Sequence, residues 1–254
     1  MERLLRATST AEARHFWFRG FRHFVTPLLR RAARSRNAGS MRDVLRLVDC
    51  GCGTGANLAL LNRFGRSYGF DLSAVGLRLG CEAGRVRMAR ASVTAAPFPS
   101  GAFDVVTSFD VLYSLDEAEE RSAIREMYRL LRPGGFAVVN VAAMESLRGD
   151  HSVLSHEVRR YCRSGLRARL ASEGFTIVRI TYTNATLFLP MLVSRAFQRR
   201  RGLRVEAEAQ RELEMPPAPV NAALSALLAV ESLWLRWFDE PVGSSLLCLA
   251  QKPV

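Results

Sequence analysis

The feature that most constrains this chain is a glycine-rich turn between an apolar strand and a helix, in the segment LRLVDCGCGTGANLALL at residues 45–61. Glycines in such a turn permit positive φ angles and let the backbone approach a ligand closely. The N-terminus of the following helix offers unpaired N–H groups. Asp71 ends the next apolar segment, where a carboxylate can accept both hydroxyls of a ribose. The pattern predicts a site for a nucleoside cofactor.

The middle of the chain alternates short apolar runs with helical segments from Val44 onward. This alternation predicts an α/β fold with a parallel, doubly wound sheet covered on both faces. Ser73 and Asp116 are expected to cap two helices, the second ending after Leu131 at Pro133-Gly134-Gly135. The expected strands are residues 45–48, 67–70, 86–89, 103–107 and 136–141, then FTIVRITYT and finally SSLLCLAQK.

We expect a single domain built from four segments. They are an N-terminal helical cap (1–40), a cofactor-binding core (44–183), a helical insertion or lid (184–243) and the last strand (244–254). The insertion is inferred because far more residues separate the last two strands than a hairpin needs. It contains expected helices at 187–201 and 221–238, separated by a charged segment and a Pro-rich hinge.

The helix at 221–238 is amphipathic, and its apolar face is expected to pack as a lid over the active edge of the sheet, with lipid contact as the alternative. Ser225, Ser232 and Arg236 are assigned to the opposite face. Glu231 falls on the apolar side, where an unpaired carboxylate is costly, so we expect an arginine partner. The apolar face is assigned to Leu224, Leu227, Leu228, Trp234, Leu235 and Phe238.

Charge and cysteine content exclude several chemistries. The formal charge is +12, and Lys252 is the only lysine, which rules out P-loop, Schiff-base and Tyr/Lys dehydrogenase chemistry. The charge suits nucleic acid, anionic lipid or a phosphorylated substrate, but a genomic preference for arginine also explains it. Five scattered cysteines favour reduced thiols, with no zinc or other metal site. Without a long apolar run or signal peptide, a cytoplasmic protein is expected.

Gly51, Gly53 and Ala56 also satisfy the dinucleotide pattern GxGxxG/A, so further features must decide between the cofactors. The stretches VDCGCGTG, GFDLS, APFPSGAFDVVTSFDVLYSL and LRPGGFAVV resemble class I S-adenosylmethionine (SAM) dependent methyltransferases of the type 11/12 group. The resemblance covers most of the chain. It implies a Rossmann-like sheet of seven strands whose last strand is antiparallel, with SAM across the carboxyl ends of the first, second and fourth strands.

The resemblance also implies roles for individual residues. Asp71 would hold the ribose, Leu72 one face of the adenine, and Phe109 would lie near the methyl group. Arg19 in the HFWFRG segment would pair with the SAM carboxylate, its alternative being a solvated arginine. Ser92 and Val93 stand where relatives often hold the adenine with an aspartate. The methionine part would be cradled by Asp49, Gly51, Cys52, Gly53 and Gly55.

Catalytic and substrate residues are expected in the connection after the fifth strand. His151 and His156 are the candidate general bases, although each could simply cap a helix. Arg160 and Tyr161, with Arg159, could bind a substrate phosphate or carboxylate, or form a solvated basic face. Ser114 replaces a histidine that many methyltransferases carry, so no base is borrowed from that position.

The function expected from these features is methylation of a small molecule, anionic or lipid-linked acceptors included. HFWFRG and SHEVRRYCRSGL look like a bacterial subset linked to secondary metabolism or saccharide biosynthesis. The alternative is a methyltransferase fold acting as a non-methylating cyclase or a binding module. Nucleic-acid methylation is less favoured, because SFDVLY lacks a base-binding motif after the fourth strand. Peripheral membrane contact stays open.

Overall fold

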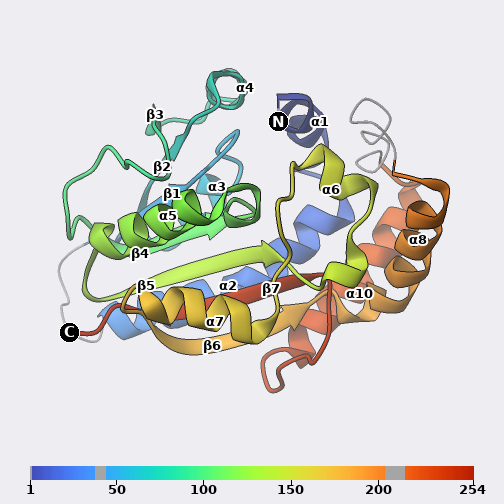
Figure 1. The fold of residues 1–254 in the computed structure, drawn as a ribbon. Helices are drawn as coiled ribbons and strands as arrows, with labels where there is room; N and C mark the ends of the chain where they lie inside the picture. The colour runs from blue at the N-terminus through green and yellow to red at the C-terminus, as the bar shows by residue number, and fades with distance from the viewer. Residues whose placement is uncertain (1, 38–43, 204–214) are drawn as a thin grey trace.

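The computed structural model describes residues 2–37, 44–203 and 215–254, and its centre is a seven-stranded sheet (Figure 1). The strand order is β3-β2-β1-β4-β5-β7-β6. All neighbours pair in parallel except β7, which runs antiparallel to β5 and β6, as expected. The strands are β1 Arg46–Cys50, β2 Arg66–Asp71, β3 Met88–Arg90, β4 Phe103–Phe109, β5 Leu131–Ala142, β6 Thr176–Thr183 and β7 Ser245–Gln251.

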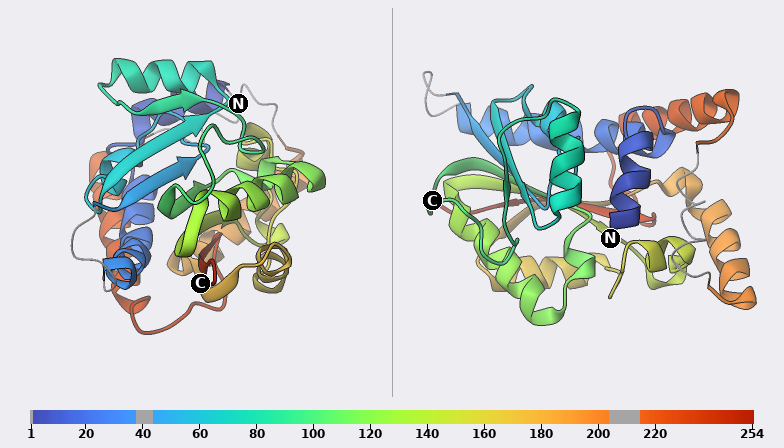
Figure 2. Two further views of the ribbon diagram at one scale, coloured as in Figure 1. Left: turned by 90° about the vertical axis from the view of Figure 1, so that its left-hand side faces the viewer. Right: turned by 90° about the horizontal axis from the view of Figure 1, so that it is seen from above.

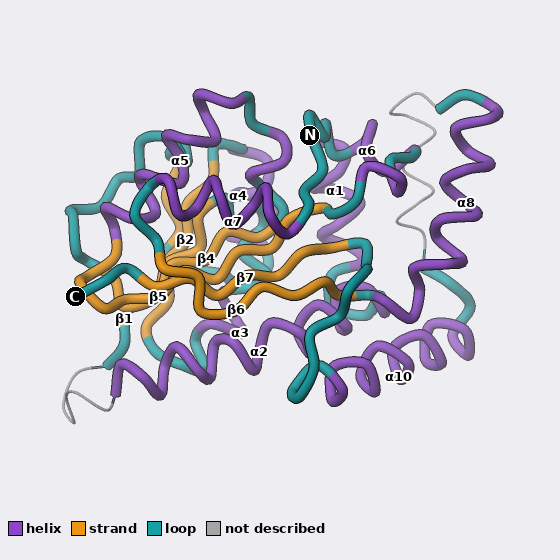
Figure 3. The backbone as a smooth tube through the Cα atoms, turned by 60° about the horizontal axis from the view of Figure 1, so that its bottom comes forward, coloured by secondary structure: helices purple, strands orange, loops and turns teal. Residues whose placement is uncertain are grey.

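Helices cover both faces of the sheet (Figure 3). Each face has its own apolar core. Helices α5 (Glu117–Leu130) and α7 (Arg163–Ser172) bury leucine, isoleucine and methionine side chains on one face. Helices α2 (Phe16–Asn37), α3 (Leu58–Leu61) and α10 (Ala218–Trp234) do so on the other. The central strand β4 is buried along its whole length. Four of its seven residues are apolar, and the buried polar Asp104 and Thr107 are hydrogen-bonded to β1.

The expected caps are present, but two strand boundaries differ from expectation. Ser73 caps α4 (Ala74–Glu82), and Asp116 forms a capping box with Glu119 at α5. Strand β5 begins at Leu131, before the Pro-Gly-Gly sequence, because Leu131 already pairs with Phe103 and an irregularity in the register absorbs the extra residues. Strand β3 is Met88–Arg90, shifted from the expected residues 86–89.

The N-terminal cap leads onto the carboxyl edge of the sheet. Helix α1 (Glu2–Ala11) packs beside α4, as the view from above in Figure 2 shows. The buried Glu12 accepts a hydrogen bond from Thr54 Oγ1 at 2.7 Å and pairs with Arg85. Because Thr54 lies in the glycine-rich turn, this buried carboxylate ties the cap directly to the turn.

The segment between β6 and β7 contains η3 (Ala185–Leu187), α8 (Phe188–Arg201) and α10, and it corrects the expected lid face. Ser225 and Ser232 are buried against α2, whereas Leu227, Trp234 and Phe238 are exposed. Leu228 and Leu235 of the expected apolar face are buried beside these serines, and Leu228 packs on Gly20 of α2, so the buried face is only offset from the expected one. The residues 204–214 of the expected charged segment lie outside the described residues.

The expected arginine partner of Glu231 is wrong. Its buried carboxylate accepts hydrogen bonds from Ala185 N at 2.9 Å, Thr186 N at 3.1 Å and Thr186 Oγ1 at 2.5 Å. Backbone and hydroxyl donors of η3 therefore satisfy the charge that we had assigned to a guanidinium.

Candidate functional site

A cavity of about 980 Å³ opens at the carboxyl ends of β1, β2, β4 and β5 and the amino end of β7. Ligands of doubly wound sheets bind at this edge. The volume is at the upper end of the ~300–1,000 Å³ typical of small-molecule sites, so the cavity can hold a cofactor together with a second molecule. Its walls come from the glycine-rich turn, the carboxyl ends of β2 and β4, the cap helices, α6 (Asp150–Leu154) and α8.

The glycine-rich turn forms one wall. Gly51 has φ +79°, and a Cβ there would lie 2.4 Å from Val111 Cγ2, so only glycine fits. Gly51, Cys52 and Gly53 line the cavity as expected. Gly55 does not: it points toward β3, where an added Cβ would lie 2.4 Å from Met88 Sδ. Its glycine is therefore required for packing behind the turn, and its expected contact with the cofactor is not seen.

Asp71 holds the turn and also faces the cavity. Its Oδ2 accepts a hydrogen bond from Gly53 N at 2.8 Å, and its Oδ1 accepts one from Ser73 N at 2.8 Å. A carboxylate has about four acceptor positions, so capacity remains for two hydroxyl donors. The predicted ribose carboxylate therefore lies where a ligand can reach it.

The next part of the lining is apolar and sparsely polar. Leu72 is 63% exposed at the cavity, and Ser92 and Val93 lie beside it. The Ser92 hydroxyl is hydrogen-bonded to Thr94 Oγ1 at 2.8 Å, and it also accepts from Thr94 N at 3.2 Å. The surface suits the face of a flat ring, with few groups reading its edge.

Asp49 differs from its expected role because it lies beneath the turn and does not line the cavity. Thr107 Oγ1 donates a hydrogen bond to its Oδ1 at 2.6 Å. Burial raises the pKa of Asp49 to about 7, which the Thr107 hydrogen bond opposes and the nearby Asp71 charge reinforces. Asp49 thus supports the turn from inside the protein.

This burial gives a prediction for Asp49→Asn. Since the folded-state pKa is raised, the folded protein holds the proton longer, and wild-type stability falls as pH rises from about 4 to 7. Asparagine does not titrate, so the variant lacks this loss. Relative to wild type, its free energy of unfolding should increase by about 2–4 kcal/mol between about pH 4 and pH 7. Urea unfolding at both pH values measures the difference, and parallel profiles would contradict the assignment.

Arg19 is exposed and does not line the cavity. Arg22, one helical turn later on α2, lines the cavity instead. Its guanidinium donates to Glu12 O at 2.9 Å and Ala13 O at 3.4 Å, which fixes it beside α1. The helical period could have indicated Arg22, because it lies on the same face as the cavity-lining Phe18.

The end of β4 supplies a residue that sequence analysis missed as a site residue, Asp110. It follows Phe109, which lines the cavity as expected, and it has φ +61°, a conformation that is rare for aspartate. Asn140 Nδ2 donates to Asp110 Oδ1 at 2.9 Å, and Asp110 N donates to Asn140 O at 3.0 Å. Asp110 is exposed where it borders the cavity. The protein around the rest of the residue desolvates its carboxyl group and raises its pKa to about 7.

The structure separates the two candidate histidines. His151 lies on α6 and lines the cavity. His156 is exposed, has φ +53° and lies outside the cavity. After α6, Ser155 N and Ser155 Oγ both donate to His151 O. Of the two candidate bases, only His151 lines the cavity.

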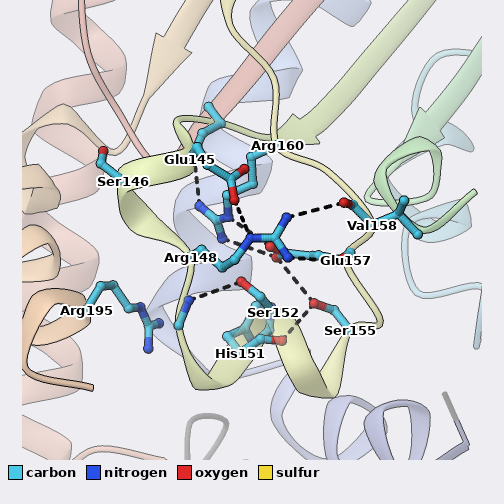
Figure 4. Close-up of polar contacts among 12 residues, drawn as sticks. Glu145, Ser146, Arg148, His151, Ser152, Ser155, Glu157, Val158, Arg160 and Arg195 are labelled. Atoms are coloured by element: carbon cyan, nitrogen blue, oxygen red, sulfur yellow. Dashed lines mark hydrogen bonds and ion pairs between the residues drawn. The ribbon is translucent and has the colours of Figure 1, made fainter. Parts of the chain in front are cut away.

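Arg160 and Tyr161 are likewise separated, and Figure 4 shows Arg160 beside Glu157. Arg160 lines the cavity and is held by Glu157 through two hydrogen bonds of 2.8 and 3.1 Å. Burial opposes ionisation of Glu157, but the Arg160 charge and hydrogen bonds prevail and lower its pKa. Tyr161 is buried away from the cavity, because its hydroxyl donates to Glu120 Oε1 at 2.7 Å. Tyr161 is thus a packing residue.

A comparison with known protein families tests the predicted family. A family model described as a methyltransferase domain matches residues 48–139, which include the glycine-rich turn, Asp71 and Asp110. Residues 48–139 therefore match a methyltransferase domain, and the strand order with antiparallel β7 agrees with the resemblance to the class I SAM-dependent methyltransferases. The expected family and fold are confirmed.

Relatives of this methyltransferase act on different substrates. Malonyl-[acyl-carrier protein] O-methyltransferase of Enterobacter lignolyticus is 33% identical over 155 residues, which cover 54% of this chain and 59% of the relative. Probable tRNA methyltransferase 9B of Mus musculus is 32% identical over 123 residues, covering 47% and 25%. The similarity therefore spans only part of each relative's length.

A solved structure shares this fold. The [4+2]-cyclase SpnF is 22% identical with a TM-score of 0.56, covering 90% of this methyltransferase and 81% of the cyclase. At this identity the likeness establishes the fold alone, and its named activity shows that the fold accommodates more than one reaction.

Proposed function

We propose that this chain transfers the methyl group of SAM to a small organic acceptor bound in the same cavity. The carrying observation is that one cavity joins the glycine-rich turn and Asp71 to a polar cluster of His151, Glu157 and Arg160. Two ligands that must meet for a displacement reaction can thus share one enclosed space.

Several features of the lining support SAM as the cofactor. Gly51 and Gly53 keep the turn wall open because no side chain projects from them, and Asp71 has remaining acceptor capacity for ribose hydroxyls. Leu72 and Val93 offer apolar contact for the adenine. When bound, SAM supplies an electrophilic methyl group on a sulfonium sulfur.

The acceptor half is assigned to the space between the cap aromatics and α8. The apolar lining of this half includes Phe16, Trp17, Phe21, Leu187 and Met191, which would exclude water from the reacting atoms. Arg160 and Arg195 on the lining favour an acceptor with an anionic group. Secondary metabolism or saccharide biosynthesis in bacteria stays our proposed context, resting on HFWFRG and SHEVRRYCRSGL.

Asp110 is our proposed general base in place of His156, with His151 as the alternative. Its carboxylate lies next to Phe109 and is oriented by the Asn140 amide, so it can take a proton from an acceptor hydroxyl or amine. Besides desolvation, which raises the pKa of Asp110 most, the Glu157 charge raises this pKa, whereas the Asn140 hydrogen bond and the Arg160 charge lower it.

Asp110→Asn should therefore lower methyl transfer about 100-fold or more while SAM affinity stays unchanged. Wild-type activity should rise through about pH 7, as Asp110 loses its proton, and the variant should lack this rise. His156→Gln, which changes an exposed side chain outside the cavity, is the matched control and should keep full activity. A normal rate and pH profile in Asp110→Asn would exclude Asp110 and leave His151 as the base.

Radiolabelled SAM tests the acceptor class directly. The protein is incubated with the labelled cofactor and either the low-molecular-weight or the RNA fraction of bacterial cells. We expect label in small organic molecules and none in RNA. Label in RNA would contradict a small-molecule acceptor and favour tRNA methylation, the activity named for a relative. Cofactor binding with no transfer to either fraction would favour a non-methylating role, such as the cyclase named among the fold neighbours.

A further inference from the structure

Helix α10 presents an apolar face to solvent. Among residues 218–234 the only charged side chain is Glu231, which is buried. Isolated exposed apolar side chains are normal on a protein surface, but a contiguous stripe along a whole helix marks an interaction surface. The exposed apolar side chains of this stripe and the turn after it are Val220, Leu227, Val230, Leu233, Trp234, Trp237 and Phe238; we call this set the α10 face.

The α10 face ends in an aromatic cluster. The rings of Trp234 and Phe238 stack with centroids 4.5 Å apart, and Trp237 is 81% exposed. Arg236 is exposed between them in the chain. Tryptophan and phenylalanine next to arginine are typical of helices that lie at the boundary between lipid headgroups and acyl chains.

The opposite side of α10 is held in place, so the helix cannot turn the α10 face inward. Leu228 packs on Gly20 of α2, where an added Cβ would lie 2.4 Å away. Asn221 Oδ1 accepts from Phe16 N at 2.8 Å, and Glu231 is bound by η3. At the C-terminal end, Arg179 of β6 donates to Asp239 and to the carbonyl of Phe238. The apolar exposure is therefore a fixed property of the fold.

Charge decides between the candidate occupants. The chain carries a formal +12, so two copies meeting at this face would repel one another, whereas an anionic surface would attract each copy. Helix α8 also carries exposed apolar residues, Leu189, Val193 and Phe197, and its last turn consists of the arginines Arg199–Arg201. Among the described helices, none is long and apolar enough to cross a bilayer.

We propose that the α10 face docks this protein on an anionic lipid bilayer, with Trp234, Trp237 and Phe238 inserted at the headgroup boundary. Leu224 of the same helix lines the cavity, so docking would bring the cavity wall close to the bilayer and to amphiphilic acceptors within it. The docking itself does not depend on the proposed methyl transfer.

Sedimentation with vesicles tests the proposal without SAM or an acceptor. The full chain should bind vesicles of equal parts phosphatidylcholine and phosphatidylglycerol, bind phosphatidylcholine alone weakly, and be released by high salt. The double variant Trp234→Ala and Trp237→Ala should bind mixed vesicles at least about tenfold more weakly, since each ring contributes insertion energy of the order seen for buried apolar side chains.

Val86→Ala is the matched control, because Val86 is an exposed apolar residue far from α10 near β3, and it should bind like wild type. Circular dichroism and SAM affinity should be unchanged in the double variant, which separates lost docking from misfolding and from failure of the proposed function. Equal vesicle binding by wild type and double variant would overturn the proposal. So would a concentration-dependent dimer in ultracentrifugation that the double variant abolishes, since it assigns the α10 face to a second copy.

Discussion

Asp71→Asn should weaken SAM binding by about 100-fold or more. The variant loses the charge that accepts hydrogen bonds from Gly53 N and Ser73 N, and its amide nitrogen cannot accept a ribose hydroxyl. Hydrogen bonds to a charged group contribute about 1.5–3 kcal/mol each, and two of them together exceed the roughly 2.8 kcal/mol of a 100-fold change. Calorimetric titration with SAM measures the affinity.

Glu82→Gln is the control for this experiment. Glu82 is an exposed acid at the end of α4, so the substitution removes the same charge from the same region without touching the cavity. It should bind SAM like wild type. Unchanged affinity in Asp71→Asn would show that the carboxylate at the end of β2 does not hold the cofactor.

Glu120→Gln should lower the free energy of unfolding by about 3 kcal/mol. The side chain of Glu120 is fully buried and accepts hydrogen bonds from Arg159, from Arg169 at 2.9 Å and from Tyr161 at 2.7 Å. Removing one partner of a buried ion pair costs about 3–5 kcal/mol, and the low end applies because both arginines are partly exposed. Tm should fall by about 6–12 °C.

Glu117→Gln provides the matched control on the same helix. The Glu117 side chain is 85% exposed and reaches Arg169 only at 3.9 Å, so its loss should change the midpoint of urea unfolding little. Tyr161→Phe should lose about 1 kcal/mol, the contribution of one hydrogen bond. Equal stability of the Glu120 and Glu117 variants would contradict the role of Glu120 as a buried hub.

The fold could be predicted from the sequence because its signals are local. Apolar runs of strand length, Ser73 and Asp116 as caps, and the glycine-rich turn each depend on a few consecutive residues. Residues next to strand ends were also placed well, because a strand's carboxyl end fixes where the following side chains lie. Asp71, Leu72 and Phe109 reach the cavity for this reason.

Errors arose where the outcome depends on distant packing. The helical period places Arg22 on the same face as Phe18, but only the packing of α2 in the fold shows that this face borders the cavity. Asp49 and Tyr161 do not line the cavity. Asp49 is hydrogen-bonded to Thr107 and Tyr161 to Glu120, and both partners are distant in the sequence. The exposed face of α10 likewise follows from its close approach to α2 at Gly20, which no periodicity reveals.

A crystal structure with S-adenosylhomocysteine, the demethylated cofactor, tests the central claim most directly. The account predicts that both ribose hydroxyls lie within hydrogen-bond distance of the Asp71 carboxylate, with the amino-acid end on the turn at Gly51–Gly53 and the sulfur directed toward Phe109. A nucleoside bound elsewhere in the molecule, or a nicotinamide dinucleotide occupying this cavity in preference, would contradict it.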